Sequence, residues 1–131
     1  MTDADLKQMS MLALAHIGDG VYELLTRTYL AESGVTAVNK LHRATVSHVC
    51  APAQARAAEA IQPILTGEEL EVYRRGRNTR VNSVPKAADL AQYHAATGLE
   101  ALFGWLWLRG ERARAEELFA AVSAGWEAQR Q

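Results

Sequence analysis

The chain has 131 residues, with 14 basic and 15 acidic side chains and a formal net charge of −1. This length suits one domain that builds its own core, and a hydrophobic content of 49% excludes a disordered chain. A net charge near zero excludes a general attraction to polyanions, so a nucleic-acid partner must meet a local basic patch. The single cysteine excludes an internal disulfide framework and indicates a reducing compartment. Because no secretory signal or bilayer-length apolar run is visible, we expect a cytoplasmic protein with no membrane partner.

Helical periodicity dominates the chain, and no segment shows the alternating pattern of a strand. We therefore expect an all-α fold. No internal repeat or shift in composition marks a boundary, which predicts a single domain over residues 1–131. The expected helices cover, in chain order, residues 3–32, 39–51, 52–65, 66–75, 85–108 and 111–130.

Local signals mark several of these helix ends. Asn39 is a good N-cap residue, and Thr66 with Glu69 matches a capping box. Pro63 is expected to end the third helix, whereas Pro85 suits the first turn of the fifth. Between the fourth and fifth helices the periodicity disappears and the composition turns to Arg, Asn, Thr and Ser, which predicts a polar loop.

The first expected helix carries an unusual acid. Asp19 stands between Gly18 and Gly20 in a segment that otherwise reads as an apolar helix. A glycine inside a helix costs roughly 1 kcal/mol relative to alanine, so a pair of them needs a reason. Without Cβ atoms, another backbone or a ligand can come close to Asp19. An acid that is ion-paired to a neighbouring helix is the alternative explanation.

The fifth expected helix repeats this pattern, because Glu100 lies between Gly98 and Gly104. If the two helices pack face to face, Asp19 and Glu100 share a partly buried site. Two such carboxylates repel each other and lose hydration unless a cation or a proton neutralises them. A hard divalent ion with oxygen ligands would do so.

Basic side chains offer another way to neutralise the two acids. The candidates are Lys40, Arg43 and Lys86. The residues alone leave both solutions open. Glu23, one turn after Asp19, is a further candidate for the same site.

Five segments together resemble a known family. Residues 17–24 (IGDGVYEL) resemble the signature helix of the ribonuclease III catalytic domain, and residues 99–104 (LEALFG) resemble its second acidic motif. Three more segments, residues 39–47, 74–78 and 84–89, resemble the compact Mini-ribonuclease III group. The resemblance runs from about residue 12 to residue 108, with the motifs in the right order and spacing.

This resemblance implies an all-α, ribonuclease III endonuclease-domain fold that forms a homodimer and lacks a double-stranded-RNA-binding domain. It also implies a magnesium-dependent endoribonuclease that cleaves double-stranded RNA. The expected substrate is the precursor of large-subunit (23S) ribosomal RNA, with a large-subunit ribosomal protein as a further candidate partner. Asp19 and Glu100 are then the catalytic residues and the Mg²⁺ ligands.

RNA binding is expected at the polar loop and its edges. Basic and amide side chains gather there: Arg74, Arg75, Arg77, Asn78, Arg80 and Lys86. Contacts with phosphates supply most of the affinity for a duplex, and A-form RNA is recognised mainly by its shape. A solvated loop with no ligand is the alternative explanation of this charge run.

The chain departs from the larger ribonuclease III enzymes at three positions. Those enzymes have glutamates where this chain has Leu12 and Ala15, and an aspartate where it has Thr97. The compact group shows the same loss, which favours an enzyme. Two alternatives stay open: a non-catalytic RNA-binding module on ribosomal particles, and a helical protein-interaction domain in which both acids are ion-paired.

Overall fold

The computed structural model describes residues 1–80 and 89–129. Helices make up the described part of the chain, which contains no strand, so the predicted all-α fold is confirmed. The elements are α1 (Asp3–Lys7), α2 (Met11–Glu32), α3 (Val38–Val49), α4 (Ala51–Ile61), the 3₁₀ helix η1 (Gln62–Ile64), α5 (Gly67–Arg77), α6 (Leu90–Leu108) and α7 (Arg112–Gln129). No helix in this part of the chain is long and apolar enough to cross a membrane.

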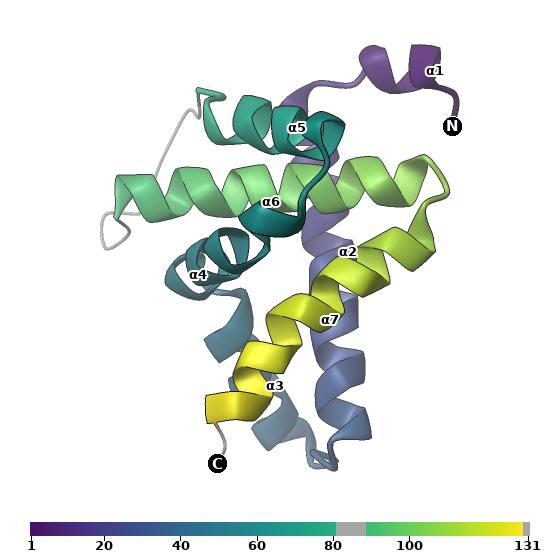
Figure 1. Ribbon diagram of the computed structural model, residues 1–131. Helices are drawn as coiled ribbons and strands as arrows, with labels where there is room; N and C mark the ends of the chain where they lie inside the picture. Colours follow the sequence, from purple (N-terminus) through teal and green to yellow (C-terminus); the bar gives the residue numbers. More distant parts are fainter. Residues whose placement is uncertain (81–88, 130–131) are drawn as a thin grey trace.

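Helix α6 is the centre of the fold. It runs across the middle of the molecule, with α5 alongside it and α2 crossing behind it at a steep angle (Figure 1). Nine of its residues are buried, including Leu99, Leu102, Phe103 and Leu106. A helix that is apolar on nearly every face must be covered on several sides, and α2, α4, α5 and α7 all pack against it.

The crossing of α2 and α6 depends on two glycines. A Cβ atom on Gly18 would lie 1.6 Å from the carbonyl oxygen of Glu100, and one on Gly104 would lie 2.0 Å from that of Leu14. The two backbones are therefore in direct contact, which only glycine allows. This contact explains Gly18, whereas a Cβ atom on Gly20 would meet no atom within 4 Å.

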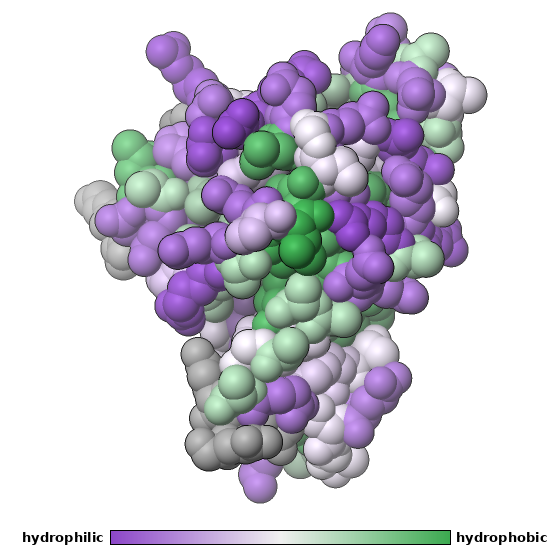
Figure 2. All heavy atoms as spheres, in the orientation of Figure 1, coloured by the Kyte–Doolittle hydropathy of each residue, from purple (hydrophilic) through white to green (hydrophobic). Residues whose placement is uncertain are grey.

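Aromatic side chains join the core to the last helix. The ring of Tyr22 on α2 packs edge-on against Phe103 and Phe119, with centroids 5.3 and 5.6 Å apart. Trp126, near the end of α7, packs against Tyr29 and Phe119. On the face shown in Figure 2, hydrophobic side chains form a narrow central strip with hydrophilic side chains on both sides, as expected for a core covered by amphipathic helices.

A buried ion pair fixes α5 against α7. Glu69 is only 5% exposed, and its carboxylate accepts hydrogen bonds of 2.9 and 2.8 Å from Arg114. Arg114 also donates to the carbonyl oxygen of Ile64 at 2.8 Å. The guanidinium of Arg114 holds the pKa of Glu69 below its ordinary value, so this carboxylate stays charged.

Two expected helix boundaries are wrong. The helix expected over residues 3–32 is divided, because Ser10 caps α2 by accepting a hydrogen bond of 3.0 Å from the amide of Ala13. Helix α3 starts at Val38 after Ala37, so Asn39 lies in the first turn and is not the cap. The break before α2 follows the cap at Ser10, whereas α3 starts after Ala37 without any side-chain cap.

Other predicted boundaries are confirmed. The capping box of Thr66 and Glu69 opens α5, and Pro63 lies in the 3₁₀ turn that follows α4. Helix α6 begins at Leu90, where Asp89 accepts a hydrogen bond of 3.0 Å from the amide of Gln92. The start expected at Pro85 lies outside the described residues.

Candidate active site

Asp19 and Glu100 lie together where α2 crosses α6. Gly18 precedes Asp19 and touches the backbone of Glu100 itself, so the contact between the helices brings the two acids to one place. Both line a cleft of about 410 Å³. Helices α2, α4 and α6 supply most of its wall, and its other lining residues are Leu12, Ala15, His16, Val49, Ala51, Gln54, Tyr93, Ala96 and Thr97.

The two carboxylates interact strongly in the absence of a cation. Burial, the charge of Asp19 and a hydrogen bond with Asp19 together raise the pKa of Glu100 to about 8, with burial the largest cause. Gln54 acts in the opposite direction by donating a hydrogen bond of 3.5 Å to Glu100. Near neutral pH the pair therefore holds a proton that a cation could replace.

Basic side chains do not neutralise this pair in the described part of the chain. No ion pair found there includes Asp19 or Glu100. Lys40 and Arg43 are exposed on α3, while Lys86 lies outside the described residues. Glu23 forms an ion pair of 3.1 Å with Arg27, one turn further along α2.

The donor set of the cleft fits a magnesium ion. Asp19 and Glu100 offer carboxylate oxygens, and the buried side-chain oxygen of Gln54 has no hydrogen-bond partner. Mg²⁺ prefers oxygen ligands and keeps several waters, so it needs few protein groups. Within the described residues, no group of three or more Asp, Glu, His or Cys side chains is arranged to hold a metal.

The three positions that depart from the larger enzymes all line this cleft. Leu12 and Ala15 contribute apolar wall, and the hydroxyl of Thr97 donates to the carbonyl oxygen of Tyr93 at 3.1 Å. The three positions that lack a carboxylate therefore all lie in this cleft, beside Asp19 and Glu100. A cation bound here would keep more of its water than in a site with five carboxylates.

The predicted RNA-binding residues gather at the end of α5. Arg74, Arg75, Asn78 and Arg80 are exposed, whereas Lys86 lies outside the described residues. Arg77 is half-buried, with its guanidinium 5.6 Å from the ring centroid of Tyr73. In Figure 1 this end of α5 lies beside the start of α6, which supplies the cleft residues Tyr93, Ala96 and Thr97.

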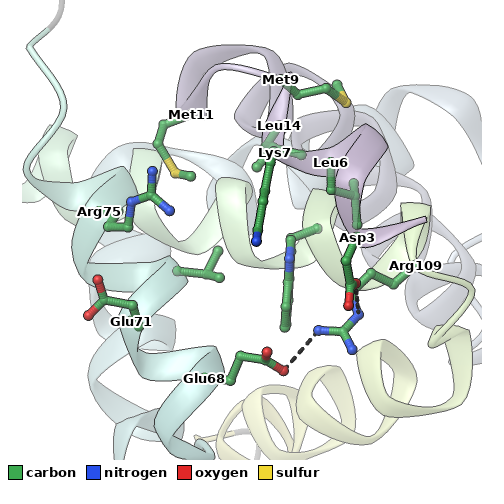
Figure 3. A pocket seen from close by; sticks show the side chains of 12 residues that line it. Asp3, Leu6, Lys7, Met9, Met11, Leu14, Glu68, Glu71, Arg75 and Arg109 are labelled. Carbon is green, nitrogen blue, oxygen red and sulfur yellow. Dashed lines mark hydrogen bonds and ion pairs between the residues drawn. The ribbon is translucent and has the colours of Figure 1, made fainter. Parts of the chain in front are cut away.

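A second hollow of about 300 Å³ lies between α1, α5 and the end of α6. In Figure 3, Lys7 extends into it, Arg75 lies between Met11 and Glu71, and Arg109 is paired with Glu68. That pair has a distance of 2.9 Å. Because its charges are of both signs, this hollow lacks the concentrated negative charge of the cleft at Asp19 and Glu100.

Gln54 and Tyr93 are cleft residues that the sequence analysis missed. Gln54 had a visible signal, because it shares the spacing of Ala57, Ala58 and Ile61, all buried on one face of α4. A lone amide on an apolar helix face needs a partner. Tyr93 had no such signal, since its position depends on where α6 meets α4.

Comparison with known proteins agrees with this geometry. Residues 12–111 match the family described as Ribonuclease III domain. The chain belongs to this family. Relatives named Mini-ribonuclease 3 include one from Clostridium tetani, which is 46% identical over 122 residues and covers 92% of this chain and 81% of that protein. One from Symbiobacterium thermophilum is 45% identical, over 86% of each chain.

More distant relatives agree on the group and on the fold. A Mini-ribonuclease 3 from Staphylococcus aureus is 33% identical over 92% of this chain and 91% of that one. A crystal structure of a protein from Fusobacterium nucleatum, 26% identical, superposes with a TM-score of 0.83 and covers 92% of this chain and 97% of that one. The chain is thus a ribonuclease III-type endoribonuclease of the Mini-ribonuclease 3 group.

Proposed function

We propose that this Mini-ribonuclease 3 cleaves double-stranded RNA by magnesium-dependent hydrolysis, with Asp19 and Glu100 as its catalytic, metal-binding residues. The observation that carries the proposal is the carboxylate pair in the cleft, where the raised pKa of Glu100 reports strong mutual repulsion and burial. The natural substrate is the precursor of 23S ribosomal RNA, presented with or without a large-subunit ribosomal protein. The whole chain, residues 1–131, acts as one catalytic domain in the cytoplasm.

The two acids and their neighbours in the cleft have different proposed roles. Asp19 and Glu100 bind the cation, and the contact of Gly18 with Glu100 fixes the spacing between them. When bound, magnesium lowers the pKa of the attacking water and stabilises charge on the phosphate and the leaving 3′-oxygen. Leu12 and Ala15 form an apolar wall beside the acids and offer the cation no ligand.

Binding of the duplex is assigned to Arg74, Arg75, Arg77, Asn78, Arg80 and Lys86. Three of these arginines lie in the last turn of α5, and that end of α5 is next to the start of α6. Phosphates bound along this edge would lead the RNA backbone toward the cleft. Because such contacts recognise shape and phosphate, sequence preference is expected to be weak.

A homodimer provides one active site for each strand of the duplex. Large apolar side chains are exposed on α2 and α3: Leu12, Leu24, Val38 and Val46, at 41, 58, 75 and 48%. Exposed apolar side chains of this kind are suited to association with a second copy, and two-fold dimers are the commonest closed assembly. The free, exposed Cys50 supports a reducing, cytoplasmic compartment.

The deciding experiment compares the wild-type chain with Asp19→Asn on a long RNA duplex, with magnesium or with a chelator. We expect magnesium-dependent cutting that the variant loses, while sedimentation and duplex binding remain close to wild type. The side chains are nearly equal in size, and Asp19 is exposed, so the fold should tolerate the change. Cutting by the variant would remove Asp19 from the mechanism. Duplex binding without any cutting by wild type on naked or ribosomal RNA would contradict the proposed reaction.

A further inference from the structure

Gln54 has a buried side-chain amide in which only one of the two polar atoms has a hydrogen-bond partner. It is only 1% exposed, on the face of α4 that carries Ala57, Ala58 and Ile61 into the core. Its side-chain nitrogen donates to Glu100 at 3.5 Å, but its side-chain oxygen is buried and has no partner. A buried acceptor without a hydrogen bond is costly, because it has lost its hydration and gained no partner.

Packing alone does not account for an amide at this position. A leucine has a similar volume and would satisfy the apolar face of α4 without leaving an unpaired oxygen. The side chain of Gln54 instead lines the same cleft as Asp19 and Glu100, which is where a cation would need oxygen ligands. Gln54 thus brings a buried, unpaired oxygen to the wall of the cleft that holds both acids.

We propose that the side-chain oxygen of Gln54 is a third protein ligand of the divalent cation held by Asp19 and Glu100, already in the RNA-free protein. This inference rests on the proposed magnesium-dependent function. The amide nitrogen of Gln54 meanwhile holds the Glu100 carboxylate in place. One side chain thereby binds the cation and positions a second ligand.

A neutral third ligand suits the charge balance of the cleft. Two carboxylates carry two negative charges, which match a single divalent ion, and the amide adds an oxygen without adding charge. Leu12, Ala15 and Thr97 offer no carboxylate there. The set of Asp19, Glu100 and Gln54 therefore favours one cation for each free subunit, with further metal ions depending on phosphate oxygens from RNA.

The test measures Mn²⁺ binding by electron paramagnetic resonance in the RNA-free full chain. We expect Gln54→Leu to weaken binding about 10-fold or more, the range typical of lost metal-site support, and Gln54→Glu to retain it. The exposed Gln62 supplies the matched control, since Gln62→Leu should bind as wild type does. If Gln54→Leu fails to fold, Gln54→Met replaces it, because methionine is flexible and fills the same space.

Thermal melting separates a ligand from a merely structural amide. If Gln54 is a ligand, Gln54→Leu should melt at or above the wild-type melting temperature in chelator. It should also lose most of the increase in melting temperature that Mg²⁺ produces in the wild-type protein. Wild-type Mn²⁺ affinity in Gln54→Leu would overturn the inference, and so would a wild-type chain that binds no Mn²⁺ without RNA. The proposed nuclease function is judged separately, by the cleavage assay with Asp19→Asn.

Discussion

Glu100 combines two features that rarely occur together, burial in the cleft and proximity to a second acid. Its pKa of about 8 in the folded protein lies well above its ordinary value of 4.5. Between these values the folded state holds a proton that the unfolded state has released. The contribution of Glu100 to stability therefore falls as pH rises from about 4.5 to 8, and it remains unfavourable at higher pH.

The fall of this contribution with rising pH gives a prediction for Glu100→Gln in the presence of chelator. Because glutamine resembles the protonated acid, the variant should melt at a higher temperature than wild type at pH 9. The difference should shrink toward pH 5, where wild type is protonated in the folded state. Melting curves recorded across this pH range provide the measurement. A constant difference at every pH would show that Glu100 is not the group responsible.

The sequence analysis found the carboxylate pair but not the amide beside it. Asp19 and Glu100 could be predicted to meet because each lies next to helix-interior glycines, a costly pattern with few explanations. Gln54 lies in a helix dominated by alanines, and its importance depends on Glu100 being its neighbour across the core. A contact between side chains from different helices follows from the packing, which local spacing does not encode.

At the scale of helices, the contact of α2 with α6 is the most demanding feature of the fold. A Cβ atom at position 18 would overlap the Glu100 carbonyl oxygen, and a backbone cannot move aside as a flexible side chain can. We therefore expect Gly18→Ala to lower the free energy of unfolding by about 3 kcal/mol or more. Urea denaturation of the purified chain measures this loss.

Gly20→Ala is the matched control for that substitution. The two glycines are two positions apart on α2, but a Cβ atom on Gly20 meets nothing within 4 Å. Alanine should therefore raise the free energy of unfolding by about 0.5–1 kcal/mol through its better helix propensity. Equal losses for both variants would mean that helix propensity, and not the helix contact, decides the effect.

A proline and a complete capping box predicted helix boundaries correctly, whereas the lone cap residue Asn39 did not. Pro63 and the pair Thr66 and Glu69 marked their boundaries correctly. The break between α1 and α2 was missed because apolar residues such as Leu6 and Met9 keep a helical spacing through it, while both still pack near Leu14. Periodicity reports which residues face the core, and it does so even where the helix itself is interrupted.

At the scale of the whole molecule, a net charge of −1 leaves RNA binding to local groups. Removing two cations near the end of α5, with Arg75→Ala and Arg77→Ala combined, should weaken duplex binding and lower the slope of log affinity against log salt by about 1–2. Titration of a labelled duplex at several salt concentrations measures both. Arg56→Ala, which removes an exposed charge from α4, serves as the control.

An unchanged slope in the double variant would show that these arginines do not contact phosphate. Arg77 already has two contacts within the protein, since its guanidinium lies over the ring of Tyr73 and it donates to Asn78 at 3.4 Å. The single variants therefore need separate titrations. A loss confined to Arg75→Ala would place the duplex on the side of α5 that faces the start of α2.

The contact between α2 and α6 also bears on how the enzyme is made. Helix α2 leaves the ribosome early, whereas α6 follows near the end of synthesis, so the two carboxylates are brought together late. A nascent chain that ends before Leu90 has Asp19 but lacks α6, the helix that carries Glu100. Such a chain cannot assemble the cleft, so the two carboxylates of the proposed active site come together only after α6 has been made.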